Sequence, residues 1–198
     1  MLADIRQNSK DDMQSIIAVH ESGHAILSAV LLQTIPEVIY SISSDADSQG
    51  FVFSKLAWNY TSRKELVPRL AMMLGGYAAE EIIFGKEHVT SGASGDIQKA
   101  TEFISFKFKK SGMGKTPISY SLPFPNGIET YHNFQTVEEE IKEAIEQGLE
   151  LAKATLTKEK KLLLAMSDYL SDNRMLKKPE IEELINTHIS KPISFITN

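Results

Sequence analysis

Apolar side chains recur at helical spacing along most of the chain. Between residues 11 and 32 they fall three or four positions apart, which predicts one long helix that ends before Pro36. A capping box formed by Ser62 and Glu65 predicts a second long helix that continues to about Gly85. Further helices are expected to begin near residues 94, 136, 157 and 179.

One short part of the chain has a strand-like pattern instead. Residues 37–42 read as a strand, residues 43–50 as a polar turn and residues 51–54 as the returning strand. Such a hairpin can simply cover the core. It can equally offer an edge strand that pairs with the main chain of an extended peptide. The pattern leaves both uses open.

These elements predict a mainly α fold with a small β-hairpin or sheet. A chain of 198 residues can bury a substantial core. We expect a single domain over residues 1–198, with a core at about 11–112 and a C-terminal helical part at about 136–187. Between them, residues 112–135 are rich in glycine and proline and are expected to be irregular.

Composition narrows the classes of function. The net charge is -5 and no basic stretch compensates for it, so no nucleic-acid partner is expected. The N-terminus is polar, and the longest apolar run, residues 25–32, is too short to cross a bilayer. We therefore expect no membrane segment in this chain and a cytoplasmic location. The chain has no cysteine, so any metal ligands must be His, Asp or Glu.

The first predicted helix carries two histidines one turn apart, His20 and His24. Residues four apart share one face of a helix, so both imidazoles can bind the same zinc ion. Glu21 then lies close enough to the open side of the metal to polarise a water. This is the H-E-x-x-H arrangement of zinc hydrolases. A buried helix with two hydrogen-bonded histidines is the alternative, and the apolar helical context makes it the weaker one.

Glycines inside the predicted helices indicate close packing. Gly23 lies between the two histidines, where glycine costs about 1 kcal/mol of helix stability relative to alanine. Another backbone is therefore expected to approach it. Gly75 and Gly76 in the second predicted helix present the bare surface that such packing requires.

Residues 90–101 join a turn rich in glycine and serine to a helix that Ser94 can cap. Asp96 falls in the first turn of this helix. On the physics of the sequence alone, compensation of the helix dipole is the better explanation of an acid at that place. A metal ligand is the alternative.

Three blocks of the sequence, taken together and in order, resemble a known family. They are HESGHA at residues 20–25, LGGYAAEEIIFG at residues 74–85 and TSGASGDI at residues 90–97. They look like the peptidase domain of the FtsH-type ATP-dependent zinc metalloproteases, and the similarity runs from about residue 15 to residue 185. The resemblance implies a mainly helical zinc-metallopeptidase domain with a small sheet beside the active site.

The resemblance also implies roles for individual residues. It implies that His20, His24 and Asp96 bind Zn2+, and that Glu21 is the general base. Glu80 is the rival third ligand, because a glutamate on a later helix completes the site in other zincins.

A sheet edge that holds an unfolded polypeptide substrate is implied as well. The residues expected at this edge are Gly50, Phe51, Val52 and Phe53.

Members of this family carry an AAA+ ATPase module ahead of the peptidase. The resemblance therefore implies an AAA+ ATPase, either as a missing N-terminal module or as a separate partner, and a homo-hexamer. The function expected is a zinc-dependent metalloendopeptidase that hydrolyses unfolded or flexible polypeptides. The competing interpretation is a degenerate peptidase fold with a binding or ring-assembly role, against which the intact metal and base residues speak.

Overall fold

The computed structural model describes residues 12–41, 50–54, 60–119 and 135–191. In these ranges the protein is mainly helical with one small sheet, as the sequence predicts. The helices are α2 (Asp12–Leu32), α3 (Arg63–Met73), α4 (Gly75–Phe84), α5 (Ser94–Lys109), α6 (Gln135–Lys158), α7 (Lys160–Asn173) and α8 (Lys178–His188). The strands and short 3-10 turns are β1 (Val38–Tyr40), β2 (Phe51–Phe53), β3 (Met175–Lys177), η1 (Lys86–His88) and η2 (Ser91–Ala93). Most of the predicted turn, residues 43–49, and residues 120–134 of the irregular segment lie outside the described residues.

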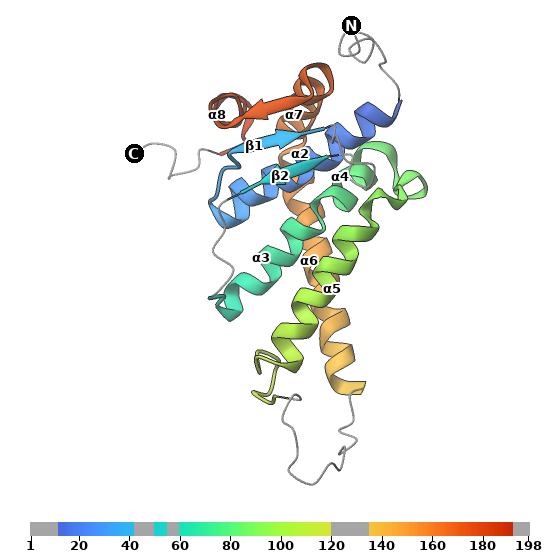
Figure 1. Ribbon diagram of the computed structural model, residues 1–198, viewed down its shortest axis with the longest axis vertical. Coiled ribbons are helices and arrows are strands. Elements are labelled where there is room, and N and C mark those ends of the chain that lie inside the picture. The colour runs from blue at the N-terminus through green and yellow to red at the C-terminus, as the bar shows by residue number, and fades with distance from the viewer. Residues whose placement is uncertain (1–11, 42–49, 55–59, 120–134, 192–198) are drawn as a thin grey trace, which may run out of the picture.

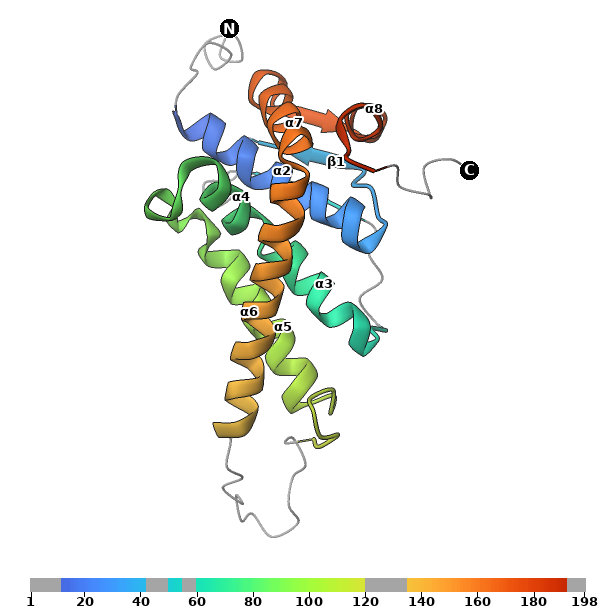
Figure 2. The same cartoon turned by 180° about the vertical axis from the view of Figure 1, so that it is seen from behind.

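Helix α2 lies at the centre of the fold. β1 and β2 cross in front of it in Figure 1, and α6 and α7 cross in front of it in the opposite view of Figure 2. Helices α3 and α4 pack against it as well. The histidine-bearing helix is therefore held by elements from nearly the whole chain.

The length and composition of α2 qualify the expectation about membranes. By these two criteria alone, residues Met13–Leu32 could cross a bilayer, although 67% of the most apolar window is buried inside the fold. The sequence-based expectation rested on the uninterrupted apolar run at residues 25–32. The whole helix is apolar on average over a longer stretch, although serines and histidines interrupt it. The cytoplasmic location stays a prediction.

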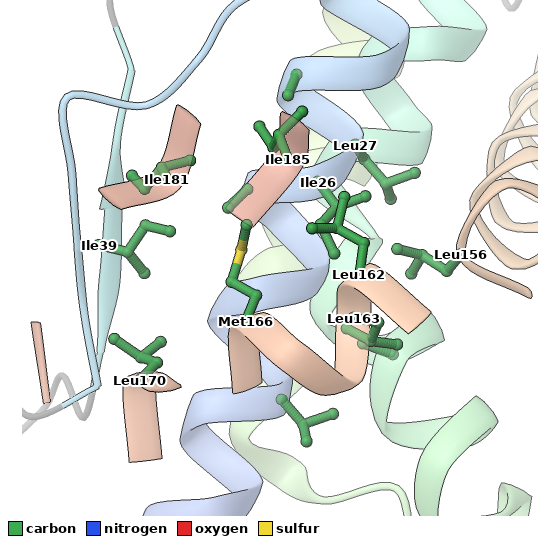
Figure 3. Close-up of a cluster of buried hydrophobic side chains, with 14 of the residues drawn as sticks. Ile26, Leu27, Ile39, Leu156, Leu162, Leu163, Met166, Leu170, Ile181 and Ile185 are labelled. Carbon is green, nitrogen blue, oxygen red and sulfur yellow. The ribbon is translucent and has the colours of Figure 1, made fainter. Parts of the chain in front are cut away.

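The main hydrophobic core lies between α2, α7, α8 and the sheet. Ile26 of α2 and Met166 of α7 belong to one fully buried cluster, which Ile39 of β1 and Ile181 of α8 join (Figure 3). Fully burying such a side chain stabilises the fold by about 1.5–3 kcal/mol. A second cluster fills the space between α3, α5 and α6. Together the two clusters fix α2, α4 and α5, which carry the candidate site.

The sheet has the strand order β2-β1-β3, and both pairs are antiparallel. Ile39 of β1 is opposite Val52 of β2 and Leu176 of β3. Strand β2 is thus an edge strand, as the peptide-binding use of the hairpin requires. Strand β3 was not predicted, because three residues between two helices are too few for an alternating pattern to show.

The second predicted helix is in fact two helices, α3 and α4, separated at Leu74. Leu74 has φ -92° and ψ 9°, outside the helical range, and it is followed by Gly75 and Gly76, which favour helix poorly. The prediction of one helix was wrong because apolar spacing continues across the break. The start of α5 also differs: Ala93 is its N-cap, and Thr90 caps the preceding turn η2.

The expected close approach at Gly23 is confirmed. A Cβ placed there would collide with the backbone carbonyl of Gly75 and lie 2.7 Å from Cβ of Ala79. Glycine at both contact positions lets the backbones of α2 and α4 touch. This contact brings the N-terminal turn of α4 against the two histidines.

Ser22 offers a test of the packing around α2. Its hydroxyl is fully buried and has no hydrogen-bond partner within the described residues. Ser22→Ala is expected to raise the free energy of unfolding by about 1 kcal/mol, because it removes an unpaired buried polar group. Thermal or urea unfolding of the metal-free protein measures the change.

Ser28 is the matched control for Ser22, since it is a buried serine on the same helix whose hydroxyl donates to the carbonyl of Thr34 at 2.7 Å. Ser28→Ala should therefore lower stability. A loss of stability in both variants would contradict the expectation for Ser22.

Candidate metal centre and active site

His20 and His24 lie on successive turns of α2 and face the same point, as their spacing predicts. Their Nε2 atoms are 3.2 Å apart. Asp96, in the first turn of α5, places Oδ2 2.9 Å from Nε2 of His20 and 3.1 Å from Nε2 of His24. Three such atoms bound tetrahedrally to one zinc ion would be about 3.3 Å apart. The three side chains therefore fit a zinc ion.

Hydrogen bonds on the far side of each imidazole leave both Nε2 atoms available. The Nδ1–H of His20 donates to Oε1 of Glu80, and the Nδ1–H of His24 donates to the backbone carbonyl of Met72, each at 2.7 Å. Met72 is in the last turn of α3, and its carbonyl also accepts the backbone N–H of Leu74, the C-cap of that helix. A neutral imidazole that donates from Nδ1 presents the lone pair of Nε2 to a metal. The acceptor that orients His24 thus lies at the end of α3, beside the unpredicted break at Leu74.

Glu80 lies behind His20 and not among the three converging atoms. Its side chain is 1% exposed, and its second oxygen, Oε2, accepts the backbone N–H of Thr90 at 2.7 Å. A carboxylate with both oxygens engaged in this way orients a histidine. Sequence reasoning treated Glu80 only as a rival ligand. Glu80 lies four residues after Gly76 and therefore on the same face of α4. Since Gly76 packs against His20, this spacing could have indicated the contact between Glu80 and His20.

The charges at the site favour a cation. Burial lowers the pKa of His20, but its hydrogen bonds with Asp96 and Glu80 outweigh burial and raise that pKa to about 10. Burial alone would raise the pKa of Asp96, yet the two neighbouring histidines hold it well below its usual range. Carboxylates thus converge on the imidazoles and hold positive charge between them. A divalent metal ion would satisfy the same field.

Gly76 allows the ring of His20 to lie directly on α4. A Cβ at this position would overlap Cε1, Nε2 and Nδ1 of that ring. The expectation of a bare surface at Gly75 and Gly76 is therefore confirmed at both residues, one against Gly23 and the other against His20.

Glu21 follows His20 on α2 and is 7% exposed. Burial raises the pKa of its carboxyl, which the nearby histidines only partly oppose. The start of β2 lies against this side chain, since a Cβ on Gly50 would be 2.6 Å from Oε1 of Glu21. A raised pKa makes a carboxylate a stronger base, which suits Glu21 to accept a proton.

The candidate residues line one open cleft of about 830 Å³. Its wall on the sheet side is the edge strand, where Phe51 and Phe53 are 44% and 51% exposed and Val52 packs inward. Lys99 also lines the cleft and places Nζ 3.7 Å from Oδ1 of Asp96. The cleft therefore combines converging ligand atoms, a buried acid and an exposed strand edge.

A helical domain with an H-E-x-x-H helix and a carboxylate, Asp96, as the candidate third ligand in the same cleft has the features of the metallopeptidase class. The chain belongs to peptidase family M41, which its sequence matches over residues 7–184. The resemblance found from the three sequence blocks is thereby confirmed.

Similarity to individual proteins supports the same conclusion. The ATP-dependent zinc metalloprotease FtsH of Mesomycoplasma conjunctivae is 31% identical over 191 residues, which cover 89% of this chain and 25% of the relative. FtsH 2 of Phytoplasma mali is 29% identical over 187 residues, with 90% and 26% covered. The ATP-dependent zinc metalloprotease YME1L of Drosophila melanogaster is 28% identical over 184 residues, with 89% and 25% covered. The chain thus spans about a quarter of the length of these relatives.

Proposed function

We propose that this chain is a zinc-dependent metalloendopeptidase that hydrolyses unfolded or flexible polypeptides. In this proposal His20, His24 and Asp96 hold Zn2+ and Glu21 is the general base. The convergence of the three ligand atoms beside the buried carboxyl of Glu21 carries the proposal. The names of the similar proteins, which are zinc metalloproteases, support it.

The chemistry divides between the metal and the protein. When bound, zinc supplies Lewis-acid chemistry, which makes water more acidic and polarises the peptide carbonyl. Glu21 takes the proton of the attacking water and passes it to the leaving amine. Glu80 and the carbonyl of Met72 keep the two imidazoles in the orientation and tautomer that ligation requires.

The substrate is held by the edge of β2. In this part of the proposal Gly50, Phe51, Val52 and Phe53 pair through their main chain with an extended polypeptide laid along the cleft. Main-chain pairing reads little sequence but needs an extended partner, so unfolded chains are the preferred substrates. The exposed rings of Phe51 and Phe53 favour apolar side chains near the cut.

The relatives named above are ATP-dependent, and this chain matches about a quarter of their length. We extend the proposal to an AAA+ ATPase as a further module or partner and to a homo-hexamer. Neither is needed for the chemistry at the site. A binding or ring-assembly module with a degenerate site is disfavoured because every residue of the proposed mechanism is present and converges.

The proposed function is tested with the purified chain loaded with zinc. We expect one zinc per chain and cleavage of casein that a chelator abolishes. A permanently unfolded protein should be degraded and its stably folded form should not, with or without ATP, since the described residues contain no ATPase module. Degradation of the folded form, or cleavage that survives metal removal, would contradict the proposal.

The third ligand can be tested by comparing two carboxylates. Glu80→Gln should weaken zinc binding about 10- to 100-fold, the usual effect of removing an outer partner of a histidine ligand. Asp96→Asn should weaken it more, because it removes both the charge and the oxygen at the ligand position. A competitive zinc titration measures both affinities. The reverse ranking would make Glu80 the ligand.

A further inference from the structure

Strand β2 touches helix α2 at two places. At one end Gly50, just before the strand, lies against Glu21. At the other end Oγ of Ser54, just after the strand, is 3.3 Å from Oγ of Ser28. The strand therefore follows α2 in the same direction for about two helical turns. Its first contact is with the proposed base.

Only glycine permits the first of these contacts. A Cβ on Gly50 would lie 2.6 Å from Oε1, 2.7 Å from Cγ and 2.9 Å from Cδ of Glu21. All three distances are shorter than a Cβ normally tolerates. Because they involve the methylene as well as the carboxyl group, the backbone at Gly50 covers the side chain along its length.

The strand is held in place by its pairing with β1. Phe51 and Val52 are paired with Tyr40 and Ile39 of β1. The carbonyl of Phe53 also accepts the backbone N–H of Glu37 at 2.9 Å. The sheet thus makes the strand a rigid wall. Gly50 directly precedes this paired strand, and the atoms that a Cβ there would meet belong to the flexible end of the Glu21 side chain, so crowding at Gly50 should displace Glu21 first.

The histidines and Glu21 are oriented by different means. Hydrogen bonds with Glu80 and the carbonyl of Met72 hold His20 and His24. Glu21 is 7% exposed, and the backbone at Gly50 packs against it. Packing against a fixed backbone limits the rotamers that a glutamate can adopt.

We propose that Gly50 is a positioning residue that holds the general base Glu21 in its working orientation. The inference rests on the proposed function and adds to the expected role of Gly50 in binding the peptide. The edge of β2 would bind the substrate, and the residue just before the same strand would position Glu21. The peptide and the base would therefore be positioned by the same strand. A misplacement of about 1 Å can lower a reaction rate about 100-fold.

The first test compares the zinc-loaded wild-type chain with Gly50→Ala on a flexible fluorogenic peptide. We expect kcat to fall about 100-fold while KM and zinc content stay close to those of the wild type. Gly95→Ala is the matched control, because a Cβ there meets nothing within 4 Å, and it should keep its activity. A rise in KM with unchanged kcat in Gly50→Ala would overturn the inference, since that is the effect of a peptide contact alone.

The second test does not depend on activity. Gly50→Ala is introduced into the metal-free wild type and into metal-free Glu21→Ala, and thermal unfolding is followed. The added methyl should lower the unfolding midpoint in the first background and have much less effect in the second, where the crowded side chain is absent. Equal shifts in both would overturn the role of Gly50. A zinc-loaded wild type without peptidase activity would instead overturn the proposed function.

Discussion

Replacement of Glu21 by glutamine is expected to abolish most peptide hydrolysis while leaving zinc bound. Loss of a general base lowers a rate by about 100- to 10,000-fold. Glutamine has nearly the same shape as glutamate, so the contact with Gly50 is kept. The three converging ligand atoms come from other side chains, so metal affinity should change little.

The expectation for Glu21 is checked by kcat on a flexible peptide together with zinc content by metal analysis. The fold should survive, because burial raises the pKa of the Glu21 carboxyl and so disfavours its charged form in the native state. A neutral amide does not meet that cost. Loss of zinc in Glu21→Gln would show that this residue is a ligand, and retained activity would show that another group takes the proton.

Gly76→Ala is expected to weaken zinc binding more than about 100-fold. This is a larger effect than the loss of a group that only hydrogen-bonds to a metal-binding histidine. The new methyl would occupy the space of the His20 ring. Rotation of the His20 ring should remove this overlap at the lowest energy, because a side chain moves more easily than the packed backbones of α2 and α4. Rotation takes Nε2 away from Asp96 and breaks the hydrogen bond between Nδ1 and Glu80.

Gly23→Ala provides the contrast to Gly76→Ala. At Gly23 the added methyl meets the backbone of Gly75, so the two helices must separate. Overpacking of this kind typically costs about 1–3 kcal/mol. Zinc titration and unfolding of both metal-free variants should therefore separate their effects. Zinc affinity should fall more in Gly76→Ala, where a ring that faces the metal is displaced, than in Gly23→Ala, where two helices separate. The opposite assignment would contradict the contacts described for the two glycines.

The amino-acid sequence by itself determined the local half of the site. The i, i+4 spacing of His20 and His24 fixes their common face wherever the segment is helical, since helix geometry is independent of the rest of the fold. The poor helix propensity of glycine predicted that another backbone approaches Gly23, and the structure confirms this contact at Gly75. Order and spacing of the three sequence blocks were specific enough to indicate the family.

Only the tertiary structure brings distant parts of the chain to the two histidines. Asp96 is 76 residues from His20, and nothing local distinguishes a ligand from an acid that compensates a helix dipole. The contacts of Glu80 with His20 and of Gly50 with Glu21 depend in the same way on the packing of whole elements. Periodicity reports which face of an element is apolar. It does not report where a helix breaks, and the carbonyl of Met72 that accepts from His24 lies beside the break at Leu74.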